Sequence, residues 1–392
     1  MSMGEALKDI AKKFDLRVGP PSVIVETVGR LSTGNLAINH VTGGGLPVGR
    51  SIELYGVESS GKTTTGLQAA AQLQPKLIAA GSTEHILYLD FEHSFDPDYA
   101  QALGIDHEHP TFLLAQPHSM EQGAEAALKL IETGLVRLSI WDSVAAMAPL
   151  SRLEGDFDQR TAAMNKARLM SGLMLQMTPL LTKYRSTAVY INHLMESIDM
   201  NAVRSNLPPK VTTPGGRALK YYASLRLEYR QLGSTKIKSL DSLTGEMANR
   251  AIASVIRVKC VKSKVSTPMR EADVCVRYGR GFDNAWSALQ VLTAHGVIPK
   301  ATGGWYRFNQ PLQHPDMETP GRSGPSIHTE ASVLAFADEH PEWSAILVSE
   351  AEHLLDQLGD KAVATTDVAV DPLAVVEEDD PLSGLAADGA QP

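Results

Sequence analysis

Cysteine is scarce in this sequence, with two in 392 residues, and so are long apolar runs. Cys260 and Cys275 alone support neither a disulfide framework nor a zinc site, and each lies in an apolar stretch where we expect a buried thiol. No run approaches the length of a membrane span, and the N-terminal residues lack the basic-then-apolar order of a secretory signal. We therefore expect a cytoplasmic protein without a membrane partner.

The sequence also lacks the excess of positive charge that neutralises nucleic-acid phosphates, since its formal net charge is −9. Residues 361–392 alone contribute −6 of that charge. The remainder of the chain is close to neutral and can carry a basic groove. Net charge therefore does not exclude a nucleic-acid partner.

What the sequence does contain is an alternation of short apolar runs with helical stretches, which begins at about Arg50. This pattern is typical of strands and helices in a largely parallel sheet, and continuous hydrophobicity indicates strands buried on both faces. Leu225–Arg230 alternates apolar with charged residues, so one face of that strand is expected to be exposed. The clearest buried strands are predicted at Ser51–Tyr55, Ile86–Phe91, Leu138–Trp141 and Thr187–Ile191.

The chain is too long for one ordinary domain, and we divide it into four regions. An amphipathic helix over Glu5–Phe14 defines an N-terminal arm, and by itself this helix is expected to pack on its own domain. Helices are also expected at Ala331–Glu339 and Ser344–Leu358, whereas Met195–Pro214 has no periodicity and indicates a long loop. The predicted regions are an arm (1–34), an α/β core (35–283), a small α/β C-terminal domain (284–359) and a disordered acidic tail (360–392).

The strongest local motif is Gly56-Val57-Glu58-Ser59-Ser60-Gly61-Lys62-Thr63, which fits G-x-x-x-x-G-K-[ST] and follows an apolar strand. Glycines in such a loop let backbone N–H groups converge on phosphates at a helix N-terminus. Lys62 is then expected to reach the outer phosphates, and the Thr63 hydroxyl to bind Mg²⁺.

Two carboxylates follow neighbouring strands of the predicted sheet. Asp142 ends the run Leu138–Trp141 and is the candidate for the metal's water shell. Glu92 follows Ile86–Phe91 and is the candidate for orienting and deprotonating water. Either residue alone is equally an ordinary acid at a strand end, and the phosphate motif favours the catalytic interpretation.

At this point the residues resemble the RecA family of bacterial and phage recombinases. The similarity covers about Leu31 to Tyr306, and its motifs occur in the family's order. It implies a RecA-like P-loop ATPase core with a mostly parallel central sheet. The motifs are Gly56–Thr64, Asp90-Phe91-Glu92-His93, Asp142–Ala146, Gly215-Gly216 with Ala218–Lys220, Lys262-Ser263-Lys264 and Tyr278-Gly279.

The resemblance implies ATP and Mg²⁺ as ligands, with Glu92 and Lys62 as catalytic residues and Thr63 and Asp142 at the metal. Tyr278 of another subunit would close over the base. The implied nucleotide contacts are Glu58, Ser59, Ser60, Gly61, Lys62, Thr63, Thr64, Asp96, Tyr99, Asp142, His193, Tyr278 and Gly279.

Lys262 and Lys264 are implied to reach the terminal phosphate of ATP held by the adjacent subunit, as catalytic groups supplied in trans. Strand periodicity gives both lysines the parity of Ile256, Val258 and Cys260, so we expect both amines to project from one side. The family likeness also implies that the N-terminal helix docks on a neighbouring subunit, which reverses the expectation drawn from the helix alone.

DNA contacts are implied for two loops, one near Glu154–Met164 and the other at Met195–Pro214. Apolar side chains there would wedge between bases. The candidate DNA-binding residues are Met164, Arg168, Ser171, Met195, Arg204, Lys210, Gly215, Gly216 and Arg217.

The sequence departs from the family at several positions. His193 stands where bacterial members usually have glutamine, which favours a phage-type protein with altered phosphate sensing. Leu175 replaces a basic position near DNA, and residues around Asn201–Pro209 are extra.

The function implied by the resemblance is ATP-dependent filament formation on single-stranded DNA, followed by strand exchange with homologous double-stranded DNA. Hydrolysis of ATP would be stimulated by DNA. Single-strand-binding and loader proteins are further candidate partners. Two alternatives stay open, a hexameric helicase or motor on the same fold and a regulatory ATP-binding paralogue.

Overall fold

The computed structural model describes residues 3–14, 18, 28–155, 159–197, 210–240, 247–301, 305, 306–309, 311–314, 326–327 and 329–357. They fall into two units, with residues 3–14, 18 and 28–29 in the first and the described residues from Arg30 onward in the second. In the first unit, α1 (Met3–Phe14) confirms the predicted helix, with Glu5 in its first turn and lysines in its last, as the helix dipole favours. The expected acidic tail, residues 360–392, lies outside the described residues.

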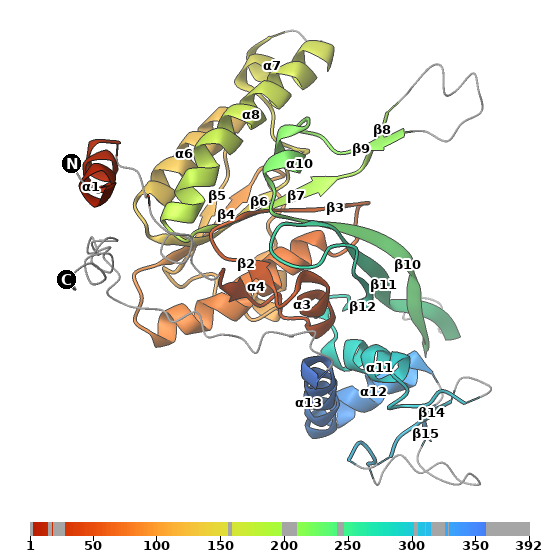
Figure 1. Cartoon of the computed structure of the whole chain (residues 1–392). Coiled ribbons are helices and arrows are strands. Elements are labelled where there is room, and N and C mark those ends of the chain that lie inside the picture. Colours follow the sequence, from red (N-terminus) through yellow and green to blue (C-terminus); the bar gives the residue numbers. More distant parts are fainter. Residues whose placement is uncertain are drawn as a thin grey trace, which may run out of the picture. The chain divides into compact units, whose positions relative to one another are not determined.

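The described residues of the larger unit form a nine-stranded sheet with the order β13-β12-β11-β10-β3-β7-β6-β4-β5 (Figure 1). From β10 to β5 all neighbours are parallel, and β11, β12 and β13 add antiparallel strands at the other edge. This arrangement confirms the mostly parallel α/β core. The strands are β3 (Ser51–Gly56), β4 (His85–Asp90), β5 (Phe112–Ala115), β6 (Val136–Asp142), β7 (Thr187–His193), β10 (Leu225–Leu240), β11 (Met247–Ser263), β12 (Glu271–Arg277) and β13 (Gly281–Phe282).

Helices cover both faces of this sheet, with α3 and α4 on one side and α6 and α8 on the other (Figure 1). Successive side chains of a strand point to opposite faces, so Ile86 joins one hydrophobic cluster and Leu87 the other. The helices are α3 (Leu36–Thr42), α4 (Lys62–Ala79), α5 (Pro97–Ala102), α6 (Met120–Glu132), α7 (Leu150–Glu154), α8 (Gln159–Lys183), α10 (Ala218–Tyr222), α11 (Asn284–Ala294), α12 (Glu330–Glu339) and α13 (Pro341–Gln357).

The C-terminal helices share a hydrophobic cluster with the core. Trp343 and Leu347 of α13 belong to the same buried cluster as Ile38 of α3. Asp283 caps α11 by accepting a hydrogen bond from the Trp286 N–H. The two helices expected near the C-terminus are confirmed as α12 and α13, while the proposed domain boundary after residue 283 stays a prediction.

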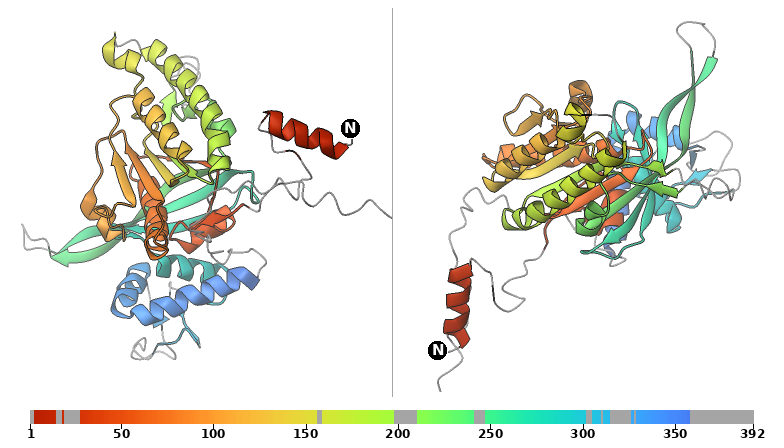
Figure 2. Two further views of the ribbon diagram at one scale, coloured as in Figure 1. Left: turned by 90° about the vertical axis from the view of Figure 1, so that its left-hand side faces the viewer. Right: turned by 90° about the horizontal axis from the view of Figure 1, so that it is seen from above.

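Short strand pairs complete the described structure. They are β1 (Arg30–Leu31) with β2 (Leu46–Pro47), β8 (Met195–Ser197) with β9 (Lys210–Thr212), and β14 (Tyr306–Arg307) with β15 (Ser326–Ile327). The longer β10–β11 hairpin extends beyond its neighbours in the sheet (Figure 2).

Two loop predictions need correction. The segment Met195–Pro214 is not structureless at its ends, because β8 and β9 pair there through backbone hydrogen bonds. Residues 198–209, with the extra residues and Arg204, lie outside the described residues. The loop expected near Glu154–Met164 is shorter than predicted, because α8 already begins at Gln159.

None of the helices in the described part of the chain has the length and apolarity needed to cross a bilayer.

Candidate nucleotide site

The phosphate loop connects β3 to α4 and leaves the N-terminus of that helix open. Gly61 is the N-cap of α4 with a φ of 80°, and no side chain caps the helix. At Gly56 an added Cβ would meet the Tyr229 carbonyl oxygen at 2.3 Å, so only glycine allows this close backbone approach. An uncapped helix N-terminus directs its free N–H groups and positive dipole end outward, which suits a phosphate group.

Lys62 lies folded into this loop. Its Nζ donates to the Val57 carbonyl oxygen at 2.5 Å and to Ser60 Oγ at 3.3 Å. Burial lowers the pKa of the Lys62 ammonium to about 8, against the opposing effect of nearby carboxylates, Asp142 first among them. A buried ammonium held by neutral oxygens is well placed to pair with an anion. Glu58 and Ser59 are exposed at the tip of the loop, and Ser60 is buried.

Two hydroxyl groups donate hydrogen bonds to the Asp142 carboxylate. Its Oδ2 accepts hydrogen bonds from Thr63 Oγ1 and from Tyr88 OH, each at 2.7 Å. Burial raises the pKa of the Asp142 carboxyl, and the two hydrogen bonds partly oppose that rise. An almost fully buried carboxylate beside a threonine hydroxyl is a set of oxygen donors that suits Mg²⁺. Tyr88 lies within a buried strand, where sequence gave no functional signal.

Glu92 lies just beyond β4 and is oriented by two side chains. Its Oε1 accepts a short hydrogen bond from Ser143 Oγ and lies 3.3 Å from His193 Nε2. The hydrogen bond with His193 is the main reason that the pKa of Glu92 lies below its ordinary value, with burial acting in the opposite direction. Glu92 is therefore an ionised, partly exposed carboxylate, able to accept a proton.

His193 ends β7, beside the strand that enters the phosphate loop. Its Nδ1 is buried and finds no hydrogen-bond partner among the described residues. The strands β4, β6, β7 and β3 are neighbours in the sheet, so their carboxyl ends bring Glu92, Asp142, His193 and Lys62 to one edge. These four sequence-predicted residues do come together.

Asp96 directly precedes α5 and Tyr99 lies in its first turn, beside the same loop. The Asp96 carboxylate caps α5 by accepting from the Tyr99 N–H at 3.0 Å. The Tyr99 hydroxyl forms a 2.8 Å hydrogen bond with Thr64 Oγ1, which ties the ring to the first turn of α4. Their contact with adenine stays a prediction.

Similarity to known proteins identifies the family to which this chain belongs. Residues 2–283 match the RecA N-terminal domain family. Protein RecA of Streptococcus gordonii is 40% identical over 313 residues, which cover 79% of this chain and 76% of that protein. Protein RecA of Streptococcus equi subsp. equi is 36% identical over 391 residues, covering 97% and 93%. This chain belongs to the RecA family.

Membership of the RecA family makes the chain a recombinase in DNA recombination and repair. The family's members are DNA-dependent ATPases, and membership implies nucleotide binding, DNA binding and self-assembly. The resemblance drawn from the sequence motifs is thereby confirmed.

A buried network that the sequence analysis missed joins this RecA-type site to the segment before Gly215. The fully buried Glu53 accepts hydrogen bonds from Arg226 Nε at 2.5 Å and from Asn192 Nδ2 at 3.0 Å. Asn192 precedes His193, and the same amide donates to the Pro214 carbonyl oxygen at 3.1 Å. The sequence did signal a buried polar contact here, because Glu53 stands inside the apolar run Ser51–Tyr55 and a buried carboxylate needs a partner.

The parity predicted for Lys262 is wrong. A β-bulge at Val261 shifts the register, so Leu227 pairs with Cys260 while the adjacent Arg226 pairs with Lys262. Lys262 therefore faces the side opposite to Cys260. Its Nζ donates to the carbonyl oxygens of Lys220 and Tyr221 in α10, at 2.7 and 2.8 Å.

The predicted contacts across subunits involve exposed residues. Lys264 is exposed just after β11. Tyr278 is 54% exposed in the turn between β12 and β13, where its hydroxyl hydrogen-bonds Ser254 Oγ at 2.8 Å. Gly279 follows with a φ of 73°. Their roles toward a neighbour's nucleotide stay predictions.

Several candidate DNA-binding residues lie along one face of α8. Met164, Arg168 and Ser171 are exposed at helical spacing, and Leu175 continues the same face. We call Met164, Arg168, Ser171 and Leu175 the α8 stripe. The structure brings Gly216 beside it, since a Cβ on Gly216 would meet Ala167 Cβ at 2.8 Å.

The other candidates flank the β8–β9 pair and α10. Met195 is exposed at the start of β8, and the exposed Arg217 is the N-cap of α10. Lys210 begins β9, although its side chain lies outside the described residues, as does all of Arg204. Gly215 has a φ of 90° beside Val144.

Proposed function

We propose that this chain forms helical filaments on single-stranded DNA, hydrolyses ATP with Mg²⁺ in them, and pairs the bound strand with a homologous duplex. One observation carries the proposal. The phosphate loop, Glu92, Asp142 and His193 lie at the carboxyl ends of four adjacent parallel strands, which is where α/β sheets bind ligands.

The phosphates of ATP would lie against the open N-terminus of α4, within the loop Glu58–Thr64. Lys62 would exchange its bonds to Val57 and Ser60 for phosphate oxygens, because a charged acceptor binds an ammonium more strongly than a neutral one. Thr63 and Asp142 would hold Mg²⁺, which when bound neutralises charge and orients the phosphates.

Glu92 would position the attacking water and take its proton at the carboxylate. Ser143 and His193 hold one carboxylate oxygen, Oε1, which fixes the orientation of the group. His193 would also sense the terminal phosphate, and the Asn192–Pro214 contact offers a direct route from there to the DNA-facing segment. On the base side, Asp96 and Tyr99 would contact adenine.

A neighbouring protomer would complete the site. Tyr278 and Gly279 would close over the base, and Lys262 and Lys264 would reach the terminal phosphate as cations supplied in trans. The exposure of Tyr278 and Lys264 supports this role. Lys262 would have to leave the α10 carbonyl oxygens, and α1 would dock on the neighbour.

DNA would run along the α8 stripe and the segment Gly215–Arg217, with Met195, Arg204 and Lys210 near its path. Single-stranded DNA and homologous double-stranded DNA are the proposed substrates, and single-strand-binding and loader proteins are further proposed partners. Cytoplasmic location stays a prediction.

A strand-exchange assay tests this function directly. Circular single strands and homologous linear duplex are incubated with the protein, ATP and Mg²⁺, and joint molecules are resolved on gels. We expect joint molecules only with both ligands and with homologous DNA. Their absence, or rings in place of helical filaments in electron micrographs, would contradict the proposal and favour a motor on the same fold.

A further inference from the structure

The turn between β12 and β13 presents Tyr278 and Gly279 on the surface. The strands pair at Arg277 with Gly281, and the Arg280 N–H donates to the Arg277 carbonyl oxygen at 3.1 Å, which closes the turn. Gly279 and Gly281 both have positive φ values, 73° and 81°. Backbone bonds thus define the turn, but its tip projects from an edge of the sheet.

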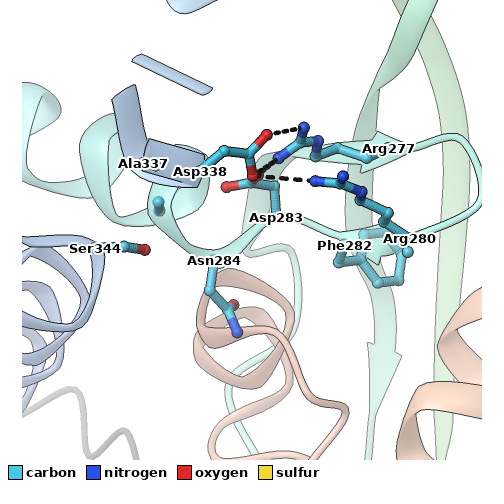
Figure 3. Close-up of a pocket in the computed structure, with 10 residues that line it drawn as sticks. Arg277, Arg280, Phe282, Asp283, Asn284, Ala337, Asp338 and Ser344 are labelled. Atoms are coloured by element: carbon cyan, nitrogen blue, oxygen red, sulfur yellow. Dashed lines mark hydrogen bonds and ion pairs between the residues drawn. The ribbon is translucent and has the colours of Figure 1, made fainter. Parts of the chain in front are cut away.

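A single carboxylate of α12 accepts hydrogen bonds from arginines on both sides of this turn. Asp338 receives two hydrogen bonds from Arg277, at 2.6 and 2.5 Å, and one from Arg280 at 3.2 Å (Figure 3). The paired bonds to Arg277 have the bidentate geometry that makes arginine–carboxylate contacts strong and directional. We call Arg277, Arg280 and Asp338 the turn clamp.

The turn clamp also reaches the start of α11. Arg277 Nη1 lies 3.4 Å from Asp283, whose other oxygen caps α11 at the Trp286 N–H. The Arg277 side chain is only 16% exposed, whereas Asp338 is 40% exposed, so loss of the carboxylate would leave a mostly buried guanidinium without its main partner. The hydrogen bonds from Arg277 lower the pKa of the Asp338 carboxyl, which keeps it ionised.

Beside the clamp lies a cavity of about 220 Å³, lined by Asn284 of α11 and Ser344 of α13 among other residues (Figure 3). Close packing would fix the turn against the C-terminal helices by itself. Leu334 of α12 packs against Cys275 of β12 behind the turn. At the turn itself, where the pocket leaves packing incomplete, the ion pairs to Asp338 supply the polar contacts with α12.

We propose that Asp338 is a positioning residue, which holds Tyr278 in place through Arg277 and Arg280 and thereby sets the affinity of the neighbouring protomer's ATP site. This inference rests on the proposed contact of Tyr278 with the neighbour's nucleotide. The C-terminal helices would then control nucleotide binding without touching the nucleotide.

The test measures KM and kcat for ATP hydrolysis on saturating single-stranded DNA with the full chain. Asp338→Asn removes the charge and keeps the shape, and we expect KM to rise about tenfold while kcat stays within about twofold. Glu125→Gln, in an exposed ion pair of α6, is the matched control and should leave both constants unchanged.

A double-mutant cycle separates positioning from a general structural effect. If Asp338 acts through Tyr278, then Asp338→Asn should raise KM no further in a Tyr278→Ala background. Additive effects on KM, a fall in kcat alone, or a wild-type KM for Asp338→Asn would each overturn the inference. If Asp338→Asn does not fold, the exposed Arg280→Gln decides, with a smaller rise in KM expected and an unchanged KM contradictory.

Failure of the proposed function looks different. A wild-type protein without DNA-stimulated hydrolysis, or an unchanged KM in Tyr278→Ala alone, would refute the shared nucleotide site itself. If the wild-type protein shows DNA-stimulated hydrolysis and Tyr278→Ala raises KM, but Asp338→Asn leaves KM unchanged, only the role of the turn clamp is refuted.

Discussion

The candidate nucleotide site and the α8 stripe, which is proposed to bind DNA, differ in how firmly contacts within one chain hold their side chains. Glu92 accepts a hydrogen bond from Ser143, and Asp142 accepts hydrogen bonds from Thr63 and Tyr88. The α8 stripe, in contrast, consists of exposed side chains on one helix face. The difference fits the proposed function, in which the phosphate site is preorganised within a protomer and DNA and the neighbouring protomer would supply what remains.

Lys262, the proposed contact to a neighbour's phosphate, is bound within this chain to α10. In the single chain its ammonium is bound to carbonyl groups of α10, just after the proposed DNA-binding residues Gly215–Arg217. A cation held there is not available to a neighbour's phosphate.

The largest expected effect is at Lys62. Lys62→Ala should lower DNA-stimulated hydrolysis by about 10³-fold or more, because the loop loses its only buried cation toward the phosphates. A colorimetric phosphate assay on single-stranded DNA measures this loss. Lys129→Ala, at an exposed lysine of α6, is the control and should hydrolyse ATP normally. Comparable loss in both variants would contradict the preorganised site.

Glu92→Gln should separate binding from chemistry. The amide keeps the size of the side chain but cannot take a proton, so we expect hydrolysis to fall by about 10²–10⁴-fold with ATP and DNA binding retained. Fluorescent-nucleotide binding and DNA mobility shifts check the two affinities. Loss of ATP binding would show that the residue has a different role.

His193→Ala should change the pH dependence. In its proposed role as a base Glu92 must be ionised, so activity should fall as pH drops through its pKa, which the hydrogen bond with His193 holds low. Without the imidazole the pKa rises, and the acid limb of the kcat–pH profile should move to higher pH. An acid limb that stays in place would show that His193 does not tune this carboxylate.

Arg168→Ala sharpens the comparison from the DNA side. Loss of one phosphate contact should weaken DNA binding at every sequence and reduce the dependence of log K on log salt by about one unit. Fluorescence anisotropy at several salt concentrations measures both effects. Lys183→Ala, in the last turn of the same helix, should match wild type. An unaltered slope in Arg168→Ala would remove the α8 stripe from the DNA path.

The smallest expected effect is a gain. Leu175 is 61% exposed on the α8 stripe, so Leu175→Lys should add a charge without disturbing the core. We expect DNA affinity to rise several-fold at low salt, because the added lysine would make about one further phosphate contact. The same anisotropy titration tests this, and unchanged affinity would place DNA elsewhere.

Local patterns predicted the phosphate loop, the carboxylates at the strand ends and the parallel sheet, because each follows from motif spacing or periodicity. The charged Glu53 inside an apolar run indicated a buried polar contact, but its partners Arg226 and Asn192 were not predictable, since they lie on two other strands that only the fold brings beside it. The bulge at Val261 was also missed, because one inserted residue reverses strand parity and leaves no mark in the hydrophobic pattern.

Dependence of ATP turnover on assembly tests the shared active centre most directly. Turnover per protomer is measured against protein concentration, with and without single-stranded DNA. We predict a steep rise with concentration that requires DNA, because in the proposed function cations from an adjacent protomer would complete each centre. Full turnover by dilute monomers in the absence of DNA would contradict that account.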